Sequence, residues 1–315
     1  MEIFTTTLGQ MAVLFSLIII GFVLAKCRIV PENSAGVLSR LENWVFIPAL
    51  VAMTFINDFT LEKLEELWKP FVISFAVLAV AIPLALLVSR LLSPKDAYMR
   101  NIYTYGLCFS NFGFMGYAVV GAVFPEYELE YIIFTLPLWM GIYLWGAPSL
   151  LMSEAGEKQT LGKRLKAICN PMFIAMVVGI IIGLSGLTLP GWVTSTLNSA
   201  KGCMSPLAMI LTGITVAHTD LKKVFTDYKI YLISAARLLL FPAIGLVACY
   251  FLPLPQSTLT CILCSVAMPL GLNTIVIPAG YGKDTTAAAS MAIVSHILSC
   301  ITIPVVLMIF ERSIV

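Results

Sequence analysis

Two stretches of the chain combine helix-breaking residues with side-chain amides, a pattern typical of a binding site built where helices open. The first is Ser110-Asn-Phe-Gly-Phe-Met-Gly116 and the second is Met268-Pro-Leu-Gly-Leu-Asn-Thr274. A broken helix offers free N–H groups and the positive end of a dipole where its second half begins, and both attract carboxylates without a buried cation. We therefore predict that an organic anion binds at Asn111, Gly113, Phe114, Met115, Gly116, Met268, Pro269, Gly271, Asn273 and Thr274.

The side chains of these stretches allow two interpretations. Asn111 and Asn273 would add hydrogen-bond donors to a site, and the large apolar side chains nearby would form its wall: Phe112, Phe114, Met115 and Met268. The same apolar side chains are equally good packing residues, and glycines let membrane helices approach closely. Unwound backbone is tolerated in a membrane only where it is buried in protein or lines a wet cavity. We favour a site because the breakers recur at corresponding places in the two stretches.

Three ionisable side chains lie in or near apolar segments, where a charge is functional by default. Glu42 is either an interfacial carboxylate that pairs with Arg40 or a loop lysine, or a functional group. Arg237 either snorkels to the interface or pairs structurally, or it is a cation that attracts an anionic substrate. His296 is either a hydrogen-bonded structural residue or a titrating relay.

The chain offers little for ion coupling or catalysis. No Asp or Glu lies deep in an apolar segment, which argues against a carboxylate proton relay. A sodium site built from Asn, Ser, Thr and backbone carbonyls stays open, with Ser110 as a candidate, and no other cofactor is predicted. Cys261 and Cys264 alone have ligand-like spacing, and we interpret them as small buried side chains. We expect no enzyme, because no H-E-x-x-H or G-x-S-x-G motif occurs.

The elements that hold these residues are predicted to be membrane-spanning helices. The 315 residues are 59% hydrophobic and 11% charged, whereas soluble domains carry about 25% charged residues. Uncharged runs of roughly 20 residues, enough for one crossing, recur along the chain, and the longest divides at the turn signal Leu252-Pro-Leu-Pro-Gln256. We predict ten spans, at about 6–25, 38–56, 70–90, 101–123, 131–152, 168–186, 202–217, 229–251, 258–281 and 286–309.

The loops predict the orientation. Glu2 and the absence of Lys or Arg before the first span oppose a secretory signal peptide. An outward N-terminus puts fourteen basic residues on the cytoplasmic side and four on the other, namely Lys63, Lys69, Lys201 and Arg312. The positive-inside rule then places both termini outside a multi-pass protein of the cell membrane. The net charge of +2 forms no basic face, so no nucleic-acid partner is expected.

The two halves of the chain resemble each other weakly. An odd number of helices per half inverts the second half in the membrane, a symmetry used by many secondary transporters. Pro48 matches Pro206, Pro83 matches Pro242, and the two amide-containing stretches match each other. We predict a first five-helix repeat at 1–152, a cytoplasmic linker at 153–167 and a second five-helix repeat at 168–315.

Several short motifs together resemble the auxin efflux carrier family of permeases, in the family's order and over nearly the whole chain. They are Asn43-Trp-Val-Phe-Ile-Pro-Ala-Leu50, Ser110-Asn-Phe-Gly-Phe-Met-Gly116, Asn170-Pro-Met172, Ser205-Pro-Leu-Ala208, Arg237-Leu-Leu-Leu-Phe-Pro242 and Ala267-Met-Pro-Leu-Gly271. The resemblance implies a ten-helix inverted-repeat fold similar to bile acid:sodium symporters. It also implies that helices 1, 2, 6 and 7 form a scaffold, and that helices 3–5 and 8–10 form a transport domain whose fourth and ninth helices cross.

The resemblance further implies organic anions as substrates, including auxin and small dicarboxylates such as malate. The plant carriers have a proline at each crossover, whereas Ala118 and Thr274 stand at those positions here. Auxin itself is therefore not carried over to this chain. The breaks are expected to rest on other residues: Gly113, Gly116, Pro269 and Gly271.

Two functions from different classes follow. The leading hypothesis is a secondary carrier that moves an organic anion by alternating access, with the anion bound between the fourth and ninth helices. The alternative is a membrane receptor or lipid-binding scaffold that keeps the same fold and transports nothing. The expected partners are a small organic anion and the lipid bilayer. A homodimer, the identity of the substrate, the coupling ion and the direction of transport stay open.

Overall fold

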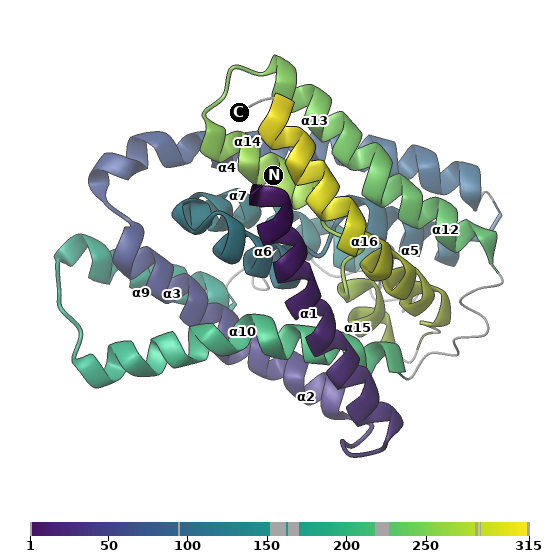
Figure 1. Ribbon diagram of the computed structural model, residues 1–315, viewed down its shortest axis with the longest axis horizontal. Coiled ribbons are helices and arrows are strands. Elements are labelled where there is room, and N and C mark those ends of the chain that lie inside the picture. The colour runs from purple at the N-terminus through teal and green to yellow at the C-terminus, as the bar shows by residue number, and fades with distance from the viewer. Residues whose placement is uncertain are drawn as a thin grey trace.

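The computed structural model describes residues 2–93, 95–151, 162, 170–217, 227–280, 283 and 285–313 (Figure 1). No strand occurs among these residues, and a single antiparallel bridge joins Ser110 to Leu270. The all-helical fold class is therefore confirmed for the described chain. The predicted linker at 153–167 lies outside the described residues except for Gly162.

Seven helical segments of the described chain are long and apolar enough to cross a membrane: Phe4–Lys26, Ser34–Asp58, Glu65–Leu92, Pro125–Leu151, Gly191–Ala217, Tyr228–Phe251 and Thr286–Ser313. Three shorter apolar helices are Phe112–Val123, Pro171–Ser185 and Gln256–Ala267. The prediction of a multi-pass membrane protein is thus confirmed. Each of the ten predicted spans overlaps one of these segments, but three of the segments are too short to cross by themselves.

The elements follow one another in the order α1 (Glu2–Lys26), α2 (Ser34–Leu41), η1 (Glu42–Phe46), α3 (Ile47–Asp58), α4 (Leu61–Leu92), α5 (Ala97–Cys108), η2 (Phe112–Gly116), α6 (Tyr117–Val123), η3 (Pro125–Tyr127), α7 (Glu128–Gly141), η4 (Ile142–Leu151), α9 (Pro171–Ser185), α10 (Gly191–Ala217), α12 (Tyr228–Ala235), η6 (Ala236–Leu240), α13 (Phe241–Phe251), α14 (Gln256–Ala267), α15 (Asn273–Gly280) and α16 (Thr286–Ser313). The η elements are π-helical turns except η3, which is a 3-10 turn.

Two helices begin earlier than the apolar runs predict. α4 begins at Leu61 instead of about 70, and α10 begins at Gly191 instead of about 202. The added turns are rich in polar and charged residues, and Lys201 in α10 forms an ion pair with Glu128 at 2.7 Å. An apolar run measures the part of a helix inside the hydrocarbon, so it misses turns that continue into the polar layer.

Local side chains fix where several helices begin and end. The Asn170 side chain accepts a hydrogen bond from the Phe173 N–H at 3.1 Å, and Pro171 occupies the first helical position of α9. Gly186 ends the same helix in the left-handed conformation (φ 65°), which glycine adopts without a Cβ clash. Asn170-Pro171 is therefore a helix-start signal.

Two π-turns each hold a charged residue in front of a proline. η1 begins at Glu42 and precedes Pro48, whereas η6 contains Arg237 and precedes Pro242. A proline removes one backbone donor and crowds the preceding turn, and π-turns in such places often lie at functional sites. Each π-turn gives its charged residue an irregular backbone setting inside a span.

One group of helices packs through very close backbone contacts. α1 packs against α10, and α3 packs against both α9 and α10. A Cβ at Gly21 would overlap the Ile210 carbonyl, and a Cβ at Gly213 would overlap the Ile18 carbonyl. Small residues at such positions let membrane helices approach closely, so α1 and α10 form one of the tightest pairs in the molecule.

The remaining helices form a second set of contacts. α4 packs against α5 and α7, α12 packs against α16, and α13 packs against α14. In Figure 1, α1 and α16 cross the near face, and these two helices are in contact. α5, η2, α14 and α15 lie among these helices, and their residues are mostly buried.

Candidate functional site

Both stretches singled out in the sequence interrupt a helix. α5 ends at Cys108, Phe109 is extended (φ −114°, ψ 99°), and the helix resumes in η2 and α6. α14 ends at Ala267, Met268 is extended (φ −67°, ψ 149°), and the helix resumes at Asn273 in α15. Each of the two helices therefore has a second half that begins inside the protein.

The two breaks are hydrogen-bonded to each other. The Asn111 N–H donates to the Pro269 carbonyl at 2.7 Å, and the Gly271 N–H donates to the Phe109 carbonyl at 3.3 Å. The Ser110 hydroxyl donates to the Ser265 carbonyl at 2.7 Å. The backbone groups that the helices release at the breaks thus find partners across the crossing, as buried polar groups must.

Gly271 makes this close approach possible, whereas Gly113 and Gly116 do not form the first break. A Cβ at Gly271 would lie 2.8 Å from the Phe109 carbonyl oxygen. The first break instead spans Phe109 to Asn111 and ends before either glycine, so the prediction that it rests on Gly113 and Gly116 is wrong. Those two glycines lie in η2, where a Cβ would meet the side chains of Trp139 and Tyr131. Both glycines thus permit close packing, and Gly113 also lines the cavity at the crossing.

One face of α7 supports the first break, and the sequence analysis did not single it out. Tyr131 donates to the Phe112 carbonyl at 3.2 Å, and Trp139 donates to the Tyr117 hydroxyl at 3.2 Å. The Thr135 hydroxyl lies 2.8 Å from the same Tyr117 hydroxyl. Tyr131, Thr135 and Trp139 recur at a spacing of four, which puts them on one helix face. That spacing is the sequence signal that could have found them.

A small cavity of about 20 Å³ lies at the crossing. Its lining comes from both breaks and from α7 and η4: Ser110, Asn111, Phe112, Gly113, Phe114, Trp139, Ile142, Gly271, Leu272 and Asn273. The second halves of both broken helices begin here, and the first N–H groups of a helix have no intrahelical partner. Among the described residues, no acidic side chain lines the cavity. Its electrostatics therefore favour an anion, although its size suits about one water molecule.

The remaining predicted site residues lie around this cavity without lining it. Met115 and Met268 are fully buried, so they pack in the core and do not form the predicted apolar wall. Thr274 donates its hydroxyl to the Gly271 carbonyl at 2.8 Å, which closes the first turn of α15. Gly116 and Pro269 also lie outside the lining. Sequence reasoning missed Trp139, Ile142 and Leu272.

Asn111 and His296 form a buried pair behind the first break. The His296 Nδ1 lies 2.7 Å from the Ala292 carbonyl, so Nδ1 carries the proton that it donates. Nε2 is then free to accept from the Asn111 side-chain amide at 3.1 Å. Both side chains are 2% exposed. His296 is thus hydrogen-bonded on both ring nitrogens, as expected of a structural histidine. Its ring orients the Asn111 side chain.

Arg237 lies at the crossing and is 2% exposed, so the snorkelling interpretation is wrong. Its guanidinium donates to four backbone carbonyls, those of Leu107, Ser265, Val266 and Met268, at 2.9 to 3.1 Å. The Phe241 ring lies 5.0 Å from the guanidinium carbon. These contacts tie η6 to the ends of both α5 and α14.

Glu42 is buried without a partner. The residue is fully buried, and neither carboxylate oxygen accepts a hydrogen bond. The predicted ion pair with Arg40 or a loop lysine is therefore wrong. η1, which holds Glu42, packs against α10, α3 and α9. A buried carboxylate without a donor is costly in its charged form.

A larger cavity of about 260 Å³ adjoins the crossing through Trp139. Apolar and aromatic side chains of α4, α7, η4 and α9 line it: Phe71, Leu136, Trp139, Met140, Tyr143, Met172, Phe173 and Met176, together with Asn170. Trp139 lines this cavity and the small one alike, and its ring stacks on that of Tyr143 at a centroid distance of 6.0 Å. Trp139 is thus the wall between the two cavities.

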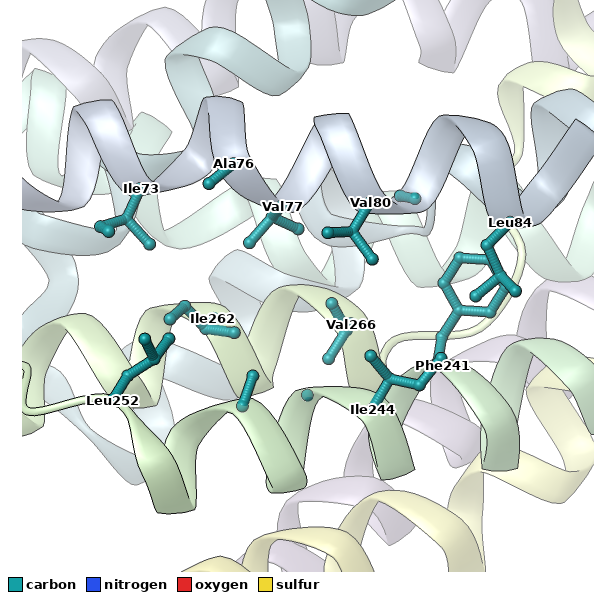
Figure 2. A pocket seen from close by; sticks show the side chains of 13 residues that line it. Ile73, Ala76, Val77, Val80, Leu84, Phe241, Ile244, Leu252, Ile262 and Val266 are labelled. Carbon is teal, nitrogen blue, oxygen red and sulfur yellow. The ribbon is translucent and has the colours of Figure 1, made fainter.

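A separate groove of about 220 Å³ runs between α4 and α13 and has α14 as its floor (Figure 2). Ile73, Val77 and Val80 face Ile244, Ile262 and Val266 across it in Figure 2. Every lining side chain is apolar. The groove therefore offers no group that could recognise the charge of an anion.

The described residues contain no group of three or more His, Cys, Asp or Glu side chains that could hold a metal ion. Cys261 and Cys264 are buried in α14, 1% and 0% exposed. Both are free thiols. Their setting is that of small buried side chains.

Comparison with known proteins identifies the family. Residues 6–307 match the family described as membrane transport protein. An uncharacterized transporter of Methanothermobacter thermautotrophicus is 26% identical over 306 residues, which cover 91% of this chain and 93% of the relative. An uncharacterized transporter of Methanocaldococcus jannaschii is 23% identical over 297 residues, with the same coverage of both chains. The chain therefore belongs to the membrane transport protein family, the auxin efflux carrier family of permeases.

Proposed function

We propose that the protein is a secondary carrier that moves an organic anion across the cell membrane by alternating access. The observation that carries this proposal is the crossing of two broken helices whose second halves begin at one cavity. Half-helix N-termini near the middle of a membrane recognise anionic groups in transporters. The absence of acidic side chains from the cavity lining supports the same charge preference.

We further propose that the chain crosses the membrane ten times as two inverted repeats, with both termini outside. The three short apolar helices fit this arrangement, because two of them belong to helices that are divided at the crossing. The third, α9, follows residues 153–167, which we propose as the cytoplasmic linker. The asymmetry of basic residues between the loops supports the orientation.

Alternating access needs two bodies that move against each other. We propose α1, α3, α9 and α10 as the scaffold, and the helices around the crossing as the transport domain. The tight glycine contacts between α1 and α10 support a rigid scaffold. The ion pair of Lys201 in α10 with Glu128 in α7 links the two bodies on the side proposed to be outside. This conformation would then be closed toward the outside.

The apolar body of the substrate would bind in the larger cavity. Its volume of about 260 Å³ and its Phe, Trp, Tyr and Met lining suit a small hydrophobic or aromatic group. The carboxylate would reach the half-helix N-termini once Trp139 moves, because Trp139 separates the two cavities. Asn111 and Asn273 would donate to the carboxylate there.

The test is uptake of labelled carboxylates into proteoliposomes by the wild-type protein and by Asn273→Ala. Asn273 lines the crossing cavity, so we expect its loss to reduce uptake by about tenfold or more, the effect of one lost charge-assisted hydrogen bond. Ser290→Ala is the matched control, since it removes a hydroxyl that is bonded within α16. It should keep wild-type uptake.

Two outcomes would contradict the proposal. Normal uptake by Asn273→Ala and Asn111→Ala, both folded, would refute the location of the site. Binding of a carboxylate, seen as thermal stabilisation, without any flux at two membrane potentials would support a non-transporting receptor on this fold.

A further inference from the structure

Arg237 is a buried cation that has no carboxylate beside it. Among the described residues, the ionisable groups closest to the Arg237 guanidinium are Cys108 and Tyr131, and no Asp or Glu side chain pairs with it. Nε donates to Met268, Nη1 to Leu107, and Nη2 to Ser265 and Val266. The four groups that accept hydrogen bonds from the guanidinium are therefore all backbone carbonyls.

These carbonyls belong to the negative ends of two helices. Leu107 lies in the last turn of α5, and Ser265 and Val266 lie in the last turn of α14. The C-terminus of a helix carries roughly half a negative elementary charge. The two C-termini together place a partial charge of about −1 at the crossing. The single positive charge of the guanidinium balances it.

Converging carbonyl oxygens at half-helix ends are also the ligands with which transporters bind a coupling sodium ion. Here the Arg237 guanidinium already donates hydrogen bonds to four such carbonyl oxygens. Hydroxyl groups at the breaks are also hydrogen-bonded within the protein: Ser110 and Thr274 donate to the carbonyls of Ser265 and Gly271. The Ser295 hydroxyl accepts from the Leu270 N–H and donates to the Ala292 carbonyl. These four carbonyls and these hydroxyl groups are therefore engaged by the protein itself.

We propose that the Arg237 guanidinium is the resident cation of the crossing and takes the place of a coupling metal ion. The carrier then works without an alkali-metal ion. Removal of the side chain leaves a set of carbonyl oxygens that binds a monovalent cation. Arg237 is in this sense a positioning residue, because it holds α5 and α14 together while the opposite helix ends, the N-termini, stay free to attract the anion. The part of the inference that concerns flux rests on the proposed transport function.

The first experiment measures stability and does not depend on transport. Purified wild type, Arg237→Ala and Leu238→Ala are unfolded thermally in chloride salts of sodium, guanidinium at low millimolar concentration, or choline. Leu238 is the matched control, since it is a neighbouring large side chain of η6 that is 1% exposed. We expect no difference between sodium and choline for the wild type. Arg237→Ala should have a lower midpoint that rises by about 3 °C or more in sodium or guanidinium, and Leu238→Ala should have a lower midpoint that no cation raises.

Arg237→Lys keeps the proposal testable if Arg237→Ala does not fold. A lysine keeps the positive charge but has fewer and less directed donors. This variant should therefore fold with a thermal midpoint below that of the wild type. Added guanidinium should raise its midpoint less than it would raise that of Arg237→Ala. A midpoint of Arg237→Ala that responds to cations no more than that of Leu238→Ala would overturn the cation site. A wild-type protein with a higher thermal midpoint in sodium than in choline would refute the proposal that Arg237 takes the place of a coupling metal ion.

The second experiment is wild-type carboxylate uptake with sodium replaced by choline on both sides of the membrane. Unchanged uptake is expected, and a tenfold loss would refute independence from sodium. Complete absence of uptake in both salts would refute transport itself. The stability series would still decide whether Arg237 fills a cation site, so the two failures are distinguishable.

Discussion

At the scale of single residues, Glu42 differs most from its predicted setting. The sequence places it near the cytoplasmic start of the second predicted span, where a basic neighbour is within reach. The structure buries it in a π-turn without a donor for either oxygen. A π-turn depends on the packing of several helices, so no local pattern around Glu42 could predict its burial.

We expect Glu42→Gln to leave the thermal midpoint unchanged or to raise it. The neutral amide avoids the cost of a buried unpaired charge, which amounts to several kcal/mol in apolar surroundings. Arg40→Ala should change the free energy of unfolding by less than about 0.5 kcal/mol, as at most exposed sites. Thermal unfolding in detergent measures both, and a clear drop for Glu42→Gln would show that the carboxylate has a favourable partner.

The candidate site was predictable at this scale only in part. Asn111, Gly271 and Asn273 line the cavity at the crossing, as the combination of helix-breaking residues with side-chain amides predicts. Such residues are otherwise unfavourable inside an apolar membrane span. Met115 and Met268 were predicted as a wall but are core residues, since the sequence does not show which side of a broken helix faces a cavity. Trp139 was missed, because its spacing with Tyr131 and Thr135 also fits ordinary packing.

At the scale of elements, the crossing depends on two backbones that touch. Gly271→Ala should destabilise the protein by roughly 1 to 3 kcal/mol, the usual effect of overpacking, because a Cβ there would meet the carbonyl oxygens of Phe109 and Ser110 at 2.8 and 3.0 Å. Backbone atoms cannot turn away as a side chain can. Gly202→Ala is the matched control in α10, since nothing lies within 4 Å of its Cβ position.

The control should be neutral or slightly stabilising, because alanine favours a helix over glycine by roughly 1 kcal/mol. Chemical or thermal unfolding of the two variants side by side gives the comparison. Equal stabilities would mean that the breaks approach each other less closely than described.

The broken helices also show what local sequence can predict about elements. The second break lies at Pro269 and Gly271, where two helix breakers occur together. The first break contains neither Pro nor Gly. Its extended backbone is stabilised instead by hydrogen bonds to the second break. Such a break is a tertiary feature. Its neighbourhood was predicted from Gly113 and Gly116, but its position at Phe109 to Asn111 was not.

At the scale of the whole molecule, the ion pair between Lys201 and Glu128 joins the two proposed bodies. Lys201→Cys with Glu128→Cys, joined by a short bifunctional thiol reagent, should lower uptake about tenfold or more, because the bodies could then no longer separate on that side. Exposed Cys27 and Cys203 are first replaced by Ser to keep the reaction specific. Cleavage of a reducible cross-link should restore uptake, and full uptake by the cross-linked protein would show that α7 and α10 move as one body.

Composition and apolar run lengths were sufficient to predict an all-helical, multi-pass membrane protein. They measure transfer into hydrocarbon, which depends on each residue alone. They could not predict that α4 and α10 extend into the polar layer, or which helices touch. Those features depend on contacts such as Gly213 against Ile18 and Lys201 against Glu128, whose partners are distant in sequence.

The pairing of the two breaks also has a consequence for biogenesis. Ser110 and the Ser265 carbonyl that it binds lie 155 positions apart in the chain. At a synthesis rate of about 5 to 20 residues per second, the first break enters the bilayer roughly 10 to 30 seconds before its partner exists. During that interval its released backbone groups must be satisfied by water, by lipid headgroups or by the insertion machinery. A nascent chain arrested before residue 265 should therefore be a substrate for membrane quality control.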